Sequence, residues 1–372
     1  MKEDTRRALE RAHERDRLFS SGRILGSMCT EPHPAALEAY QKFLETNLGD
    51  ATLFPGTKEL ERQVVNKVGA LLNAPSSADG QMTSGGTESN LTALWVHTQL
   101  QGTKTVVVPE HAHFSFRKAA SLMNLELKTL PCRNHVADTE TLPDMLDGNV
   151  ACVVAVAGTT NLGLVDPIEA MAACCREADV PLHVDAAFGG FVLPFLHQLG
   201  MSDKAFDFSI DEVNSISLDP HKMGMSVIPS GLLLLRNGEW FERIAVQATC
   251  THTRRQLSLL GTRPGAAAAA TYAVLQELGW DGYCDVVRRC MDTTRHAAER
   301  LNAAGFTLVT EPETNVVAAQ VDSPQRVADE LAEHGWMVGV NEPDGALRLV
   351  MMPHVKKTLI DSFVSDLKAV VT

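Results

Sequence analysis

Basic residues are scarce in this chain. Its 372 residues include 33 lysines and arginines against 46 aspartates and glutamates, which gives a net charge of −13 with neutral histidines. Nucleic acids and anionic membrane surfaces bind clustered Lys and Arg side chains. The charge balance therefore argues against both as partners.

Long apolar runs and paired cysteines are also missing. No run approaches the roughly 20 apolar residues that cross a bilayer, and the chain opens on Met-Lys-Glu-Asp-Thr-Arg-Arg rather than on an apolar signal segment. The sequence has 8 cysteines, but no two are spaced as CxxC. These absences predict a cytoplasmic protein with reduced thiols. The hydrophobic content of 45% is that of a globular protein.

The first part of the chain alternates short apolar strands with helices. We expect helices over residues 58–73 and 167–176 and strands over 105–108, 151–157, 181–184 and 231–235. Short buried strands separated by helices are typical of an α/β fold with a mostly parallel central sheet and helices on both faces. Ligands of such sheets bind beyond the carboxyl ends of the strands.

The pattern changes near residues 261–265. Beyond this point the sequence predicts a smaller α+β domain, with helices over 266–278, 283–303 and 325–334, strands over 306–310, 315–321 and 346–351, and a terminal helix. A charged N-terminal helix over 4–19 has only a thin apolar face, formed by Leu9 and Leu18. We therefore expect an N-terminal segment (1–48) that packs on a partner subunit, a large domain (49–262) and a small C-terminal domain (263–372).

Four motifs near the expected strand ends carry candidate chemistry. Ser-Leu-Asp-Pro-His-Lys-Met-Gly at 217–224 contains Lys222, and such a lysine can form a Schiff base with an aldehyde cofactor. His-Val-Asp-Ala-Ala-Phe-Gly-Gly at 183–190 places Asp185 at the end of an apolar strand. Thr-Ser-Gly-Gly-Thr-Glu at 83–88 opens a helix, and Ala-His-Phe-Ser-Phe at 112–116 supplies His113. Together these motifs predict a site for pyridoxal 5′-phosphate (PLP).

The chain resembles the group II PLP-dependent amino acid decarboxylases, because the motifs occur in that family's order. The resemblance runs from about Gly22 to the C-terminus and is greatest to the archaeal tyrosine/aspartate decarboxylases. It implies the PLP-dependent transferase fold type I, as in aspartate aminotransferase. It also implies PLP as the cofactor, a free amino acid as the substrate and a homodimer as the active unit.

The resemblance assigns a role to each residue around the cofactor ring. Lys222 would carry the cofactor, with a pKa lowered by burial and a nearby cation. Asp185 would pair with the pyridine nitrogen and keep its proton in place. His113 would cover one ring face and Ala187 would lie against the other. We expect the neighbouring His111 to be a solvated loop residue, and the His-x-His pair has no further metal ligands at compatible spacing.

The cofactor phosphate would lie at the start of the helix that follows residue 85. Gly86 and Thr87 would hold it with backbone N–H groups and a hydroxyl, and Ser84 and His221 would assist. Asp219 stands where several relatives have Asn, so its role is open. Thr160 matches a family threonine near the phenolic oxygen of the cofactor, and Asp166 orders the same loop.

Three residues are candidates for substrate binding. Arg348 is a lone charge in an apolar strand, and a bidentate clamp on the substrate α-carboxylate would explain it. A structural ion pair is the alternative. Asn47 matches a substrate contact of glutamate-specific relatives, and Ser27 lies in a segment that would border the pocket. Both are alternatively loop and packing residues.

Tyrosine is also scarce, and the chain lacks a tyrosine in the loop where the family has one. The family's mobile loop carries a tyrosine that is thought to return a proton to Cα, but this chain has only Tyr40, Tyr272 and Tyr283. The corresponding stretch, 248–256, offers Cys250 and His252 instead. His252 has the pKa class that suits proton donation near neutral pH.

The sequence thus predicts PLP-dependent decarboxylation of an L-amino acid. The leading substrate is L-aspartate, giving β-alanine for coenzyme A biosynthesis, and the other is L-tyrosine, giving tyramine for methanofuran biosynthesis. One alternative is a PLP-dependent carbon–carbon lyase of the sphingosine-phosphate-lyase type. A non-catalytic PLP-binding paralogue is the other.

Overall fold

The computed structural model describes residues 1–249, 252 and 254–371. Its central sheet has the strand order β1-β9-β8-β7-β6-β2-β3. The strands are β1 (Asp79–Thr83), β9 (Gly231–Leu235), β8 (Val213–Leu218), β7 (Leu182–Asp185), β6 (Val150–Val156), β2 (Thr105–Pro109) and β3 (Glu126–Leu130). Only β9 is antiparallel to its neighbours within this sheet. The predicted mostly parallel α/β sheet is confirmed.

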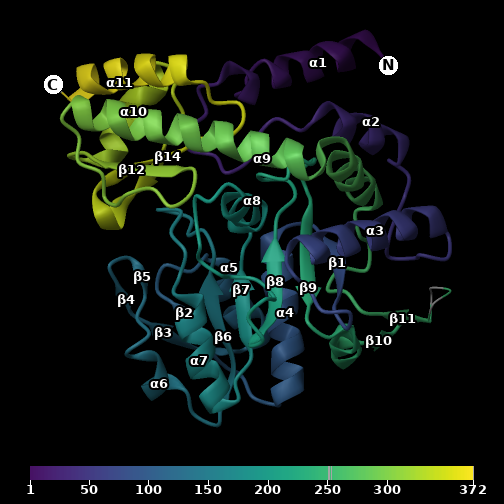
Figure 1. Cartoon of the computed structure of the whole chain (residues 1–372). Coiled ribbons are helices and arrows are strands. Elements are labelled where there is room, and N and C mark those ends of the chain that lie inside the picture. Colours follow the sequence, from purple (N-terminus) through teal and green to yellow (C-terminus); the bar gives the residue numbers. More distant parts are fainter. Residues whose placement is uncertain (250–251, 253, 372) are drawn as a thin grey trace.

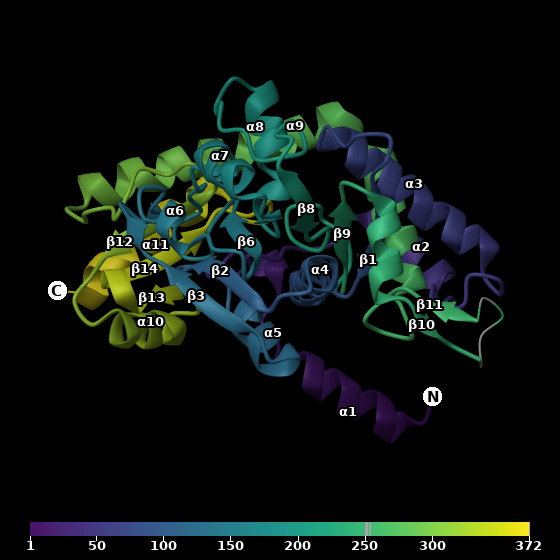
Figure 2. The same cartoon turned by 90° about the horizontal axis from the view of Figure 1, so that it is seen from below.

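Helices cover both faces of this sheet (Figures 1 and 2). They include α3 (Pro55–Leu71), α4 (Gly86–Gln101), α5 (Ser115–Met123), α7 (Ile168–Ala178) and α8 (Leu193–Gln198). Strand β6 reads Val-Ala-Cys-Val-Val-Ala-Val and is buried along its whole length. Side chains of β2 and β6 that point to one face pack on α4 and α5, while the opposite face packs on α7. Burial on both faces explains why these strands are continuous apolar runs.

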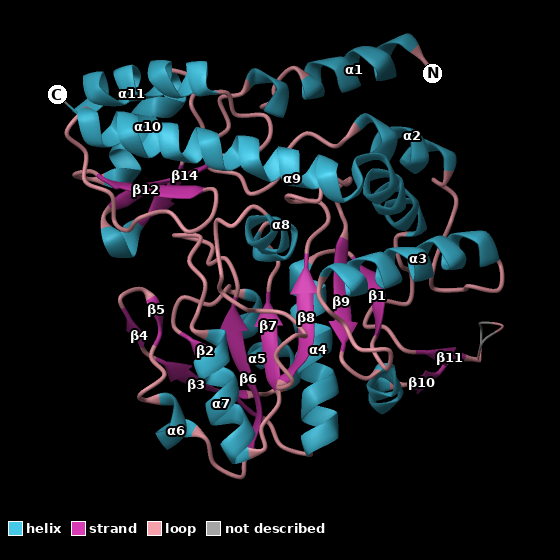
Figure 3. Ribbon diagram, viewed as in Figure 1, coloured by secondary structure: helices cyan, strands magenta, loops and turns pink. Residues whose placement is uncertain are grey.

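The C-terminal part forms a second, smaller layer (Figure 3). Its antiparallel sheet has the order β12-β14-β13, with β12 (Val316–Gln320), β14 (Ala346–Val350) and β13 (Gly339–Asn341). Helices α10 (Pro324–Glu333) and α11 (Lys357–Val371) pack beside it. Of the strand expected over 306–310, only a bridge between Leu308 and Ala319 forms.

One long helix, α9 (Gly265–Ala303), joins the two parts. It contains both helices that the sequence predicts, and they are separated at Gly279, where φ is 56° and ψ is −164°. Only glycine adopts this backbone conformation readily. Residues 267–291 of α9, on both sides of Gly279, pack in the core of the large domain, together with α2 (Pro34–Lys42) and α3. Ala297 and Leu301, near the end of α9, pack in the core of the small domain. The core therefore changes within α9, after residue 291 rather than at residue 263.

Different parts of the N-terminal segment have different surroundings. Helix α1 (Glu3–His13) has no buried residue and projects from the body of the molecule in both views (Figures 1 and 2). Leu25, in contrast, lies in the core of the small domain, and Ala36 and Leu48 lie in the core of the large one. The part from about residue 24 onward therefore contributes apolar side chains to the cores of its own chain. Packing of the segment 1–48 on a partner subunit stays a prediction.

The remaining short elements lie at the periphery. They are β4 (Cys132–Arg133), β5 (Val136–Ala137), α6 (Leu142–Met145), β10 (Val246–Gln247) and β11 (Arg255–Gln256). Across the part of the chain that the structure describes, every helix is too short or too polar to cross a membrane.

Candidate active site

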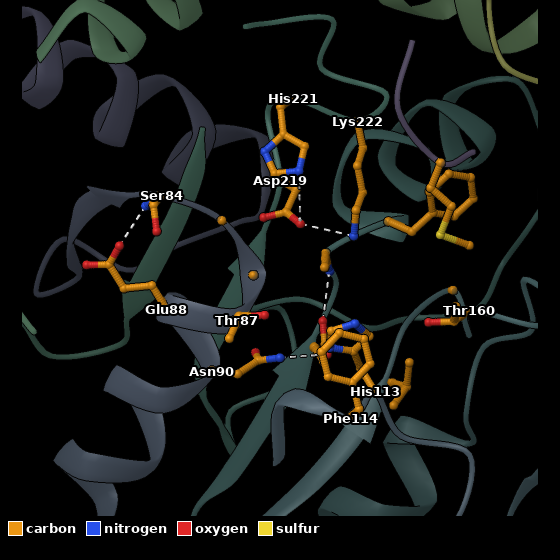
Figure 4. Close-up of a pocket in the computed structure, with 18 residues that line it drawn as sticks. Ser84, Thr87, Glu88, Asn90, His113, Phe114, Thr160, Asp219, His221 and Lys222 are labelled. Atoms are coloured by element: carbon orange, nitrogen blue, oxygen red, sulfur yellow. Dashed lines mark hydrogen bonds and ion pairs between the residues drawn. The ribbon is translucent and has the colours of Figure 1, made fainter. Parts of the chain in front are cut away.

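A cavity of about 320 Å³ opens beyond the carboxyl ends of the parallel strands (Figure 4). Loops that follow β1, β2, β6, β7 and β8 all contribute to its lining, as expected for ligand sites of such sheets. The lining contains all ten residues that the sequence assigns to the cofactor: Ser84, Gly86, Thr87, His113, Thr160, Asp185, Ala187, Asp219, His221 and Lys222. Their individual roles toward the cofactor stay predictions.

Lys222 lies in the turn after β8 and points into the cavity (Figure 4). Its Nζ is 3.0 Å from Asp219 Oδ2. Burial lowers the pKa of Lys222, but the carboxylates of Asp219 and Asp185 outweigh burial and raise it above its ordinary value. The prediction that burial and a nearby cation lower the pKa of Lys222 is therefore wrong for the protein without bound cofactor. The neighbouring His113 and His221 do not act as cations because burial lowers the pKa of both.

The opposite wall is the start of α4. The backbone N–H of Ser84 donates to Glu88 Oε2 at 2.7 Å, which fixes the first turn of the helix. A Cβ on Gly86 would lie 3.1 Å from Asp219 Oδ2 and 3.2 Å from the Ala187 Cβ. Glycine therefore keeps this helix terminus open to the cavity, as an incoming phosphate requires.

Asp185 ends β7 on the floor of the cavity and is buried. Its Oδ2 accepts a hydrogen bond from Asn90 Nδ2 at 2.8 Å, and its Oδ1 accepts one from the Ala187 N–H at 3.1 Å. Donors converge on both oxygens, an arrangement that suits a carboxylate facing a protonated ring nitrogen.

His113 and Phe114 form an aromatic wall. Their ring centroids are 3.9 Å apart, and His113 Nδ1 accepts from the Ser115 N–H at 3.3 Å. In Figure 4 both side chains lie on the same side of the cavity, and Lys222 points toward them from the other side. A flat imidazole in this position can cover a planar cofactor.

The residues present fit PLP. The cavity lies in the size range of small-ligand sites, about 300–1,000 Å³. It combines an open helix start, a lysine, a carboxylate with its donors in place and an aromatic wall. In addition, the buried Asp219 Oδ1 has no hydrogen-bond partner among the described residues. An unsatisfied buried acceptor is costly, which indicates that a bound group completes the site.

The three predicted substrate residues do not line this cavity. Arg348 donates to the carbonyl of Thr160 at 3.0 Å and to that of Gly26, and both of these segments border the site. Its Nε has no hydrogen-bond partner among the described residues, and burial lowers its pKa with no described carboxylate to oppose it. Asn47 Oδ1 accepts from the N–H groups of Gly49 and Arg263.

Asn47 therefore orders a loop, and Ser27 does the same through the N–H of Cys29. Met28, from the same segment as Ser27, does line the cavity. Of the two proton-donor candidates, His252 does not line the cavity of its own chain. The His252 side chain is 70% exposed, and its Nδ1 is 3.3 Å from Asp50 Oδ2. Cys250 lies outside the described residues.

His111 is not the solvated loop residue that the sequence predicts. Its Nε2 is 2.9 Å from Asp166 Oδ1, and its side chain is largely buried. Burial lowers the pKa of His111, but Asp166 and Cys132 outweigh it and raise the pKa to about 10. Asp166 also accepts from the N–H groups of Val156 and Ala137. It orders the loop, as expected.

Comparisons with known proteins agree with this geometry. A model of the pyridoxal-dependent decarboxylase conserved domain matches residues 38–321. A probable L-tyrosine/L-aspartate decarboxylase of Methanothrix thermoacetophila is 49% identical over 94% of this chain and 90% of that protein. A probable L-aspartate decarboxylase of Archaeoglobus fulgidus is 39% identical over 96% of each chain. An L-aspartate/L-glutamate decarboxylase of Pyrococcus horikoshii is 39% identical over 96% of this chain and 94% of that protein.

Solved structures share the whole architecture. A sphingosine-1-phosphate lyase of Burkholderia pseudomallei superposes with a TM-score of 0.91 at 28% identity, covering 100% of this chain and 91% of that one. A glutamate decarboxylase of Lactobacillus brevis superposes with a TM-score of 0.88 at 21% identity, covering 100% and 92%. The fold is therefore that of the fold type I PLP enzymes.

The chain belongs to the pyridoxal-dependent decarboxylase family, and PLP is its cofactor. More particularly, it is a carboxy-lyase that removes the carboxylate of an amino acid.

Proposed function

We propose that the substrate is L-aspartate and the product β-alanine. One observation carries this choice: aspartate is the amino acid common to the names of the relatives from Methanothrix, Archaeoglobus and Pyrococcus. β-Alanine would then enter coenzyme A biosynthesis. Decarboxylation of L-tyrosine to tyramine, for methanofuran, is the second reading, because tyrosine is named in the Methanothrix relative.

A comparison of kcat/KM for the two amino acids tests this choice. We expect the value for aspartate to exceed that for tyrosine. A tyrosine value more than about tenfold above the aspartate value, roughly 1.4 kcal/mol of transition-state preference, would overturn the substrate and leave the decarboxylase activity standing.

The side chains around the cavity would have different roles in the reaction. PLP, when bound, supplies an aldehyde for an amine and a ring that withdraws electrons. Lys222 would hold the cofactor, Asp185 would keep a proton on the ring nitrogen, and His113 would restrain the ring. Arg348 would receive the substrate carboxylate, because its side chain bonds to the Thr160 and Gly26 carbonyls, whose segments border the cavity, and its guanidinium is a planar donor fork.

We also propose that the enzyme is a cytoplasmic homodimer. Helix α1 supports this, since an isolated helix of 11 residues that buries nothing is marginal in water. The dimer would place His252 near the cavity of the partner subunit, because His252 is exposed and away from the cavity of its own chain. A sedimentation experiment in which an active monomer persists at micromolar concentration would contradict the dimer.

Hybrid dimers test the position of His252. Lys222→Ala and His252→Ala proteins are each expected to have little activity, and mixing with subunit exchange is expected to restore part of it. Restoration requires His252 of one subunit to serve Lys222 of the other. No restoration, with hybrids verified by differently sized tags, would place the donor within the same subunit or assign the step to another group.

A second candidate is carbon–carbon cleavage of a phosphorylated amino alcohol. It is favoured by the structural similarity to the Burkholderia sphingosine-1-phosphate lyase. Such a substrate needs cations for a second phosphate, whereas the described cavity lining contributes only Lys222 and two histidines of lowered pKa. A product assay separates the two activities, because a decarboxylase releases carbon dioxide and the lyase releases an aldehyde. Membership of a family of amino acid decarboxylases argues against the third possibility, a non-catalytic paralogue.

A further inference from the structure

A chain of buried polar side chains leads from the floor of the cavity into the sheet. It starts at Asp185 and continues through Asn90, His183 and Ser215 to His97, and each of these is at least 96% buried. Asn90 and His97 come from α4, whereas the other members come from the adjacent strands β7 and β8. Polar groups in such a position cost free energy unless each has a partner.

The contacts are continuous. Asn90 Nδ2 donates to Asp185 Oδ2 at 2.8 Å, and Asn90 Oδ1 lies 3.0 Å from His183 Nε2. His183 Nδ1 is 2.8 Å from Ser215 Oγ, and Ser215 Oγ is 2.8 Å from His97 Nε2. Two serine hydroxyls provide the remaining hydrogen bonds of the Asn90 amide. Its Nδ2 donates to Ser115 Oγ at 3.0 Å, and its Oδ1 accepts from Ser217 Oγ at 2.6 Å.

The chemistry of these groups fixes the direction of each hydrogen bond from His97 to Asp185. Asn90 turns its amide nitrogen to the Asp185 carboxylate, so its oxygen faces His183 and can only accept. His183 therefore carries its proton on Nε2. Burial lowers its pKa to about 3, so the ring is neutral and its Nδ1 is an acceptor.

The same logic continues to the far end. Ser215 has a single hydroxyl hydrogen and gives it to His183 Nδ1, so its oxygen must accept from His97 Nε2. Burial and the neighbouring His183 lower the pKa of His97 to about 3 as well, so its ring is also neutral. Every hydrogen bond along the chain thus points toward Asp185.

We propose that Asn90, His183 and Ser215 are positioning residues for the cofactor, because their one-directional hydrogen-bond chain orients the Asp185 carboxylate toward the ring nitrogen and stabilises the proton there. Aligned hydrogen bonds polarise one another in a low-dielectric interior, so each donor adds to the field at Asp185. The inference rests on PLP as the cofactor and is independent of the amino acid substrate.

The tautomers are tested first, in the apoprotein. Two-bond nitrogen–proton correlations of histidine-labelled protein are expected to show His183 and His97 as neutral rings protonated on Nε2 between pH 5 and 7. A ring protonated on Nδ1, or an imidazolium, at either position would overturn the direction of the chain without any reference to cofactor binding.

The effect on the cofactor is tested with matched serine variants. Ser215→Ala breaks the chain at its third side chain from Asp185, beyond Asn90 and His183. Ser226→Ala is the control, because Ser226 is equally buried and bonds to Thr271 Oγ1 at 2.9 Å outside the chain. The probe is PLP labelled with ¹⁵N in its ring, together with its dissociation constant.

We expect Ser215→Ala to move the ring-nitrogen signal toward the unprotonated value and to weaken PLP binding about threefold. Asn90→Ala is expected to move the signal further and to weaken binding about tenfold, as loss of a hydrogen bond to a charged group predicts. Ser215→Thr, which keeps the hydroxyl, should restore the wild-type signal, and Ser226→Ala should retain it. If Asn90→Ala does not fold, the comparison of Ser215→Ala with Ser215→Thr tests the proposal by itself.

A wild-type ring-nitrogen signal in folded Ser215→Ala would overturn the proposal. An equal shift in Ser226→Ala would do so too, because it would reduce the effect to general loosening of the core. Failure of the wild-type protein to bind PLP at all would instead contradict the cofactor, so the two failures are distinguishable.

Discussion

A buried ion pair in the large domain makes a large contribution to stability, which a substitution can measure. Glu61, on α3, is fully buried, and the side chain of Arg263, two residues before the start of α9, is 8% exposed. Arg263 Nη1 donates to Glu61 Oε1 and to the Met82 carbonyl, and Arg263 Nη2 donates to the Leu48 carbonyl at 3.1 Å. The pair therefore ties the N-terminal segment, α3, β1 and α9 together. We predict that Arg263→Leu strongly destabilises the large domain.

The expected loss follows from what remains after the substitution. Removing one member of a buried pair leaves an uncompensated charge and costs about 3–5 kcal/mol. Lys58 Nζ stays 2.7 Å from Glu61 Oε2, and the Met82 N–H still donates to Glu61 Oε1. We therefore place the loss near the lower limit, about 3 kcal/mol. The double variant Glu61→Leu/Arg263→Leu should be less destabilised than Arg263→Leu, because no lone charge is buried.

The pH dependence supplies an internal check. Burial raises the pKa of Glu61, but Arg263 and Lys58 outweigh burial, so the net pKa in the folded protein lies below the ordinary value of 4.5. Because the folded pKa is the lower one, the pair stabilises the protein above about pH 4.5 and this stability is lost as the pH falls through the folded pKa. The difference between wild type and Arg263→Leu should therefore shrink as the solution is acidified.

Urea unfolding of the apoproteins, followed by far-UV circular dichroism, measures these differences. Using apoprotein removes the contribution of cofactor binding to stability. An unfolding free energy of Arg263→Leu within about 1 kcal/mol of wild type at pH 7, the size of a solvent-exposed pair, would refute the reasoning. So would a difference that grows on acidification.

Two further predictions concern the cavity. Gly86→Ala is expected to weaken PLP binding at least roughly tenfold, because the new Cβ would meet Asp219 and Ala187 at the helix start. Fluorescence titration with PLP measures the affinity. An unchanged affinity would contradict the assignment of the cofactor phosphate to this helix start. Arg348→Lys is expected to raise KM for the amino acid about tenfold or more while PLP binding is retained, because a lysine cannot reproduce a bidentate contact; steady-state kinetics measure this, and an unchanged KM would give Arg348 a purely structural role.

The sequence was informative where chemistry is concentrated in short motifs. Lys222, Asp185 and His113 each follow a strand of the same sheet, and parallel strands present their carboxyl ends at one edge, so local motifs were sufficient to bring them together. Strand β1, Asp-Gly-Gln-Met-Thr, was not predicted, because it has little apolar pattern and owes its place to pairing with β9.

Long-range pairing also hid the roles of Asn90 and His111. Asn90 lies one helical turn after Gly86, on the same face of α4, and this spacing was the available signal. Its partner Asp185 is 95 residues away, however, and only the folded chain brings them together. His111 reads as a loop residue until Asp166, 55 residues later, is placed beside it. The role of α9 in both domains likewise depends on packing that periodicity does not encode.

The most direct test of the account is the identity of the lysine that holds PLP. Borohydride reduction of the PLP-loaded protein, followed by peptide mapping, is expected to find the cofactor attached to Lys222 alone, and Lys222→Ala should yield no covalent adduct. Attachment to a different lysine, or an undiminished adduct in Lys222→Ala, would contradict the assignment of this cavity as the active site.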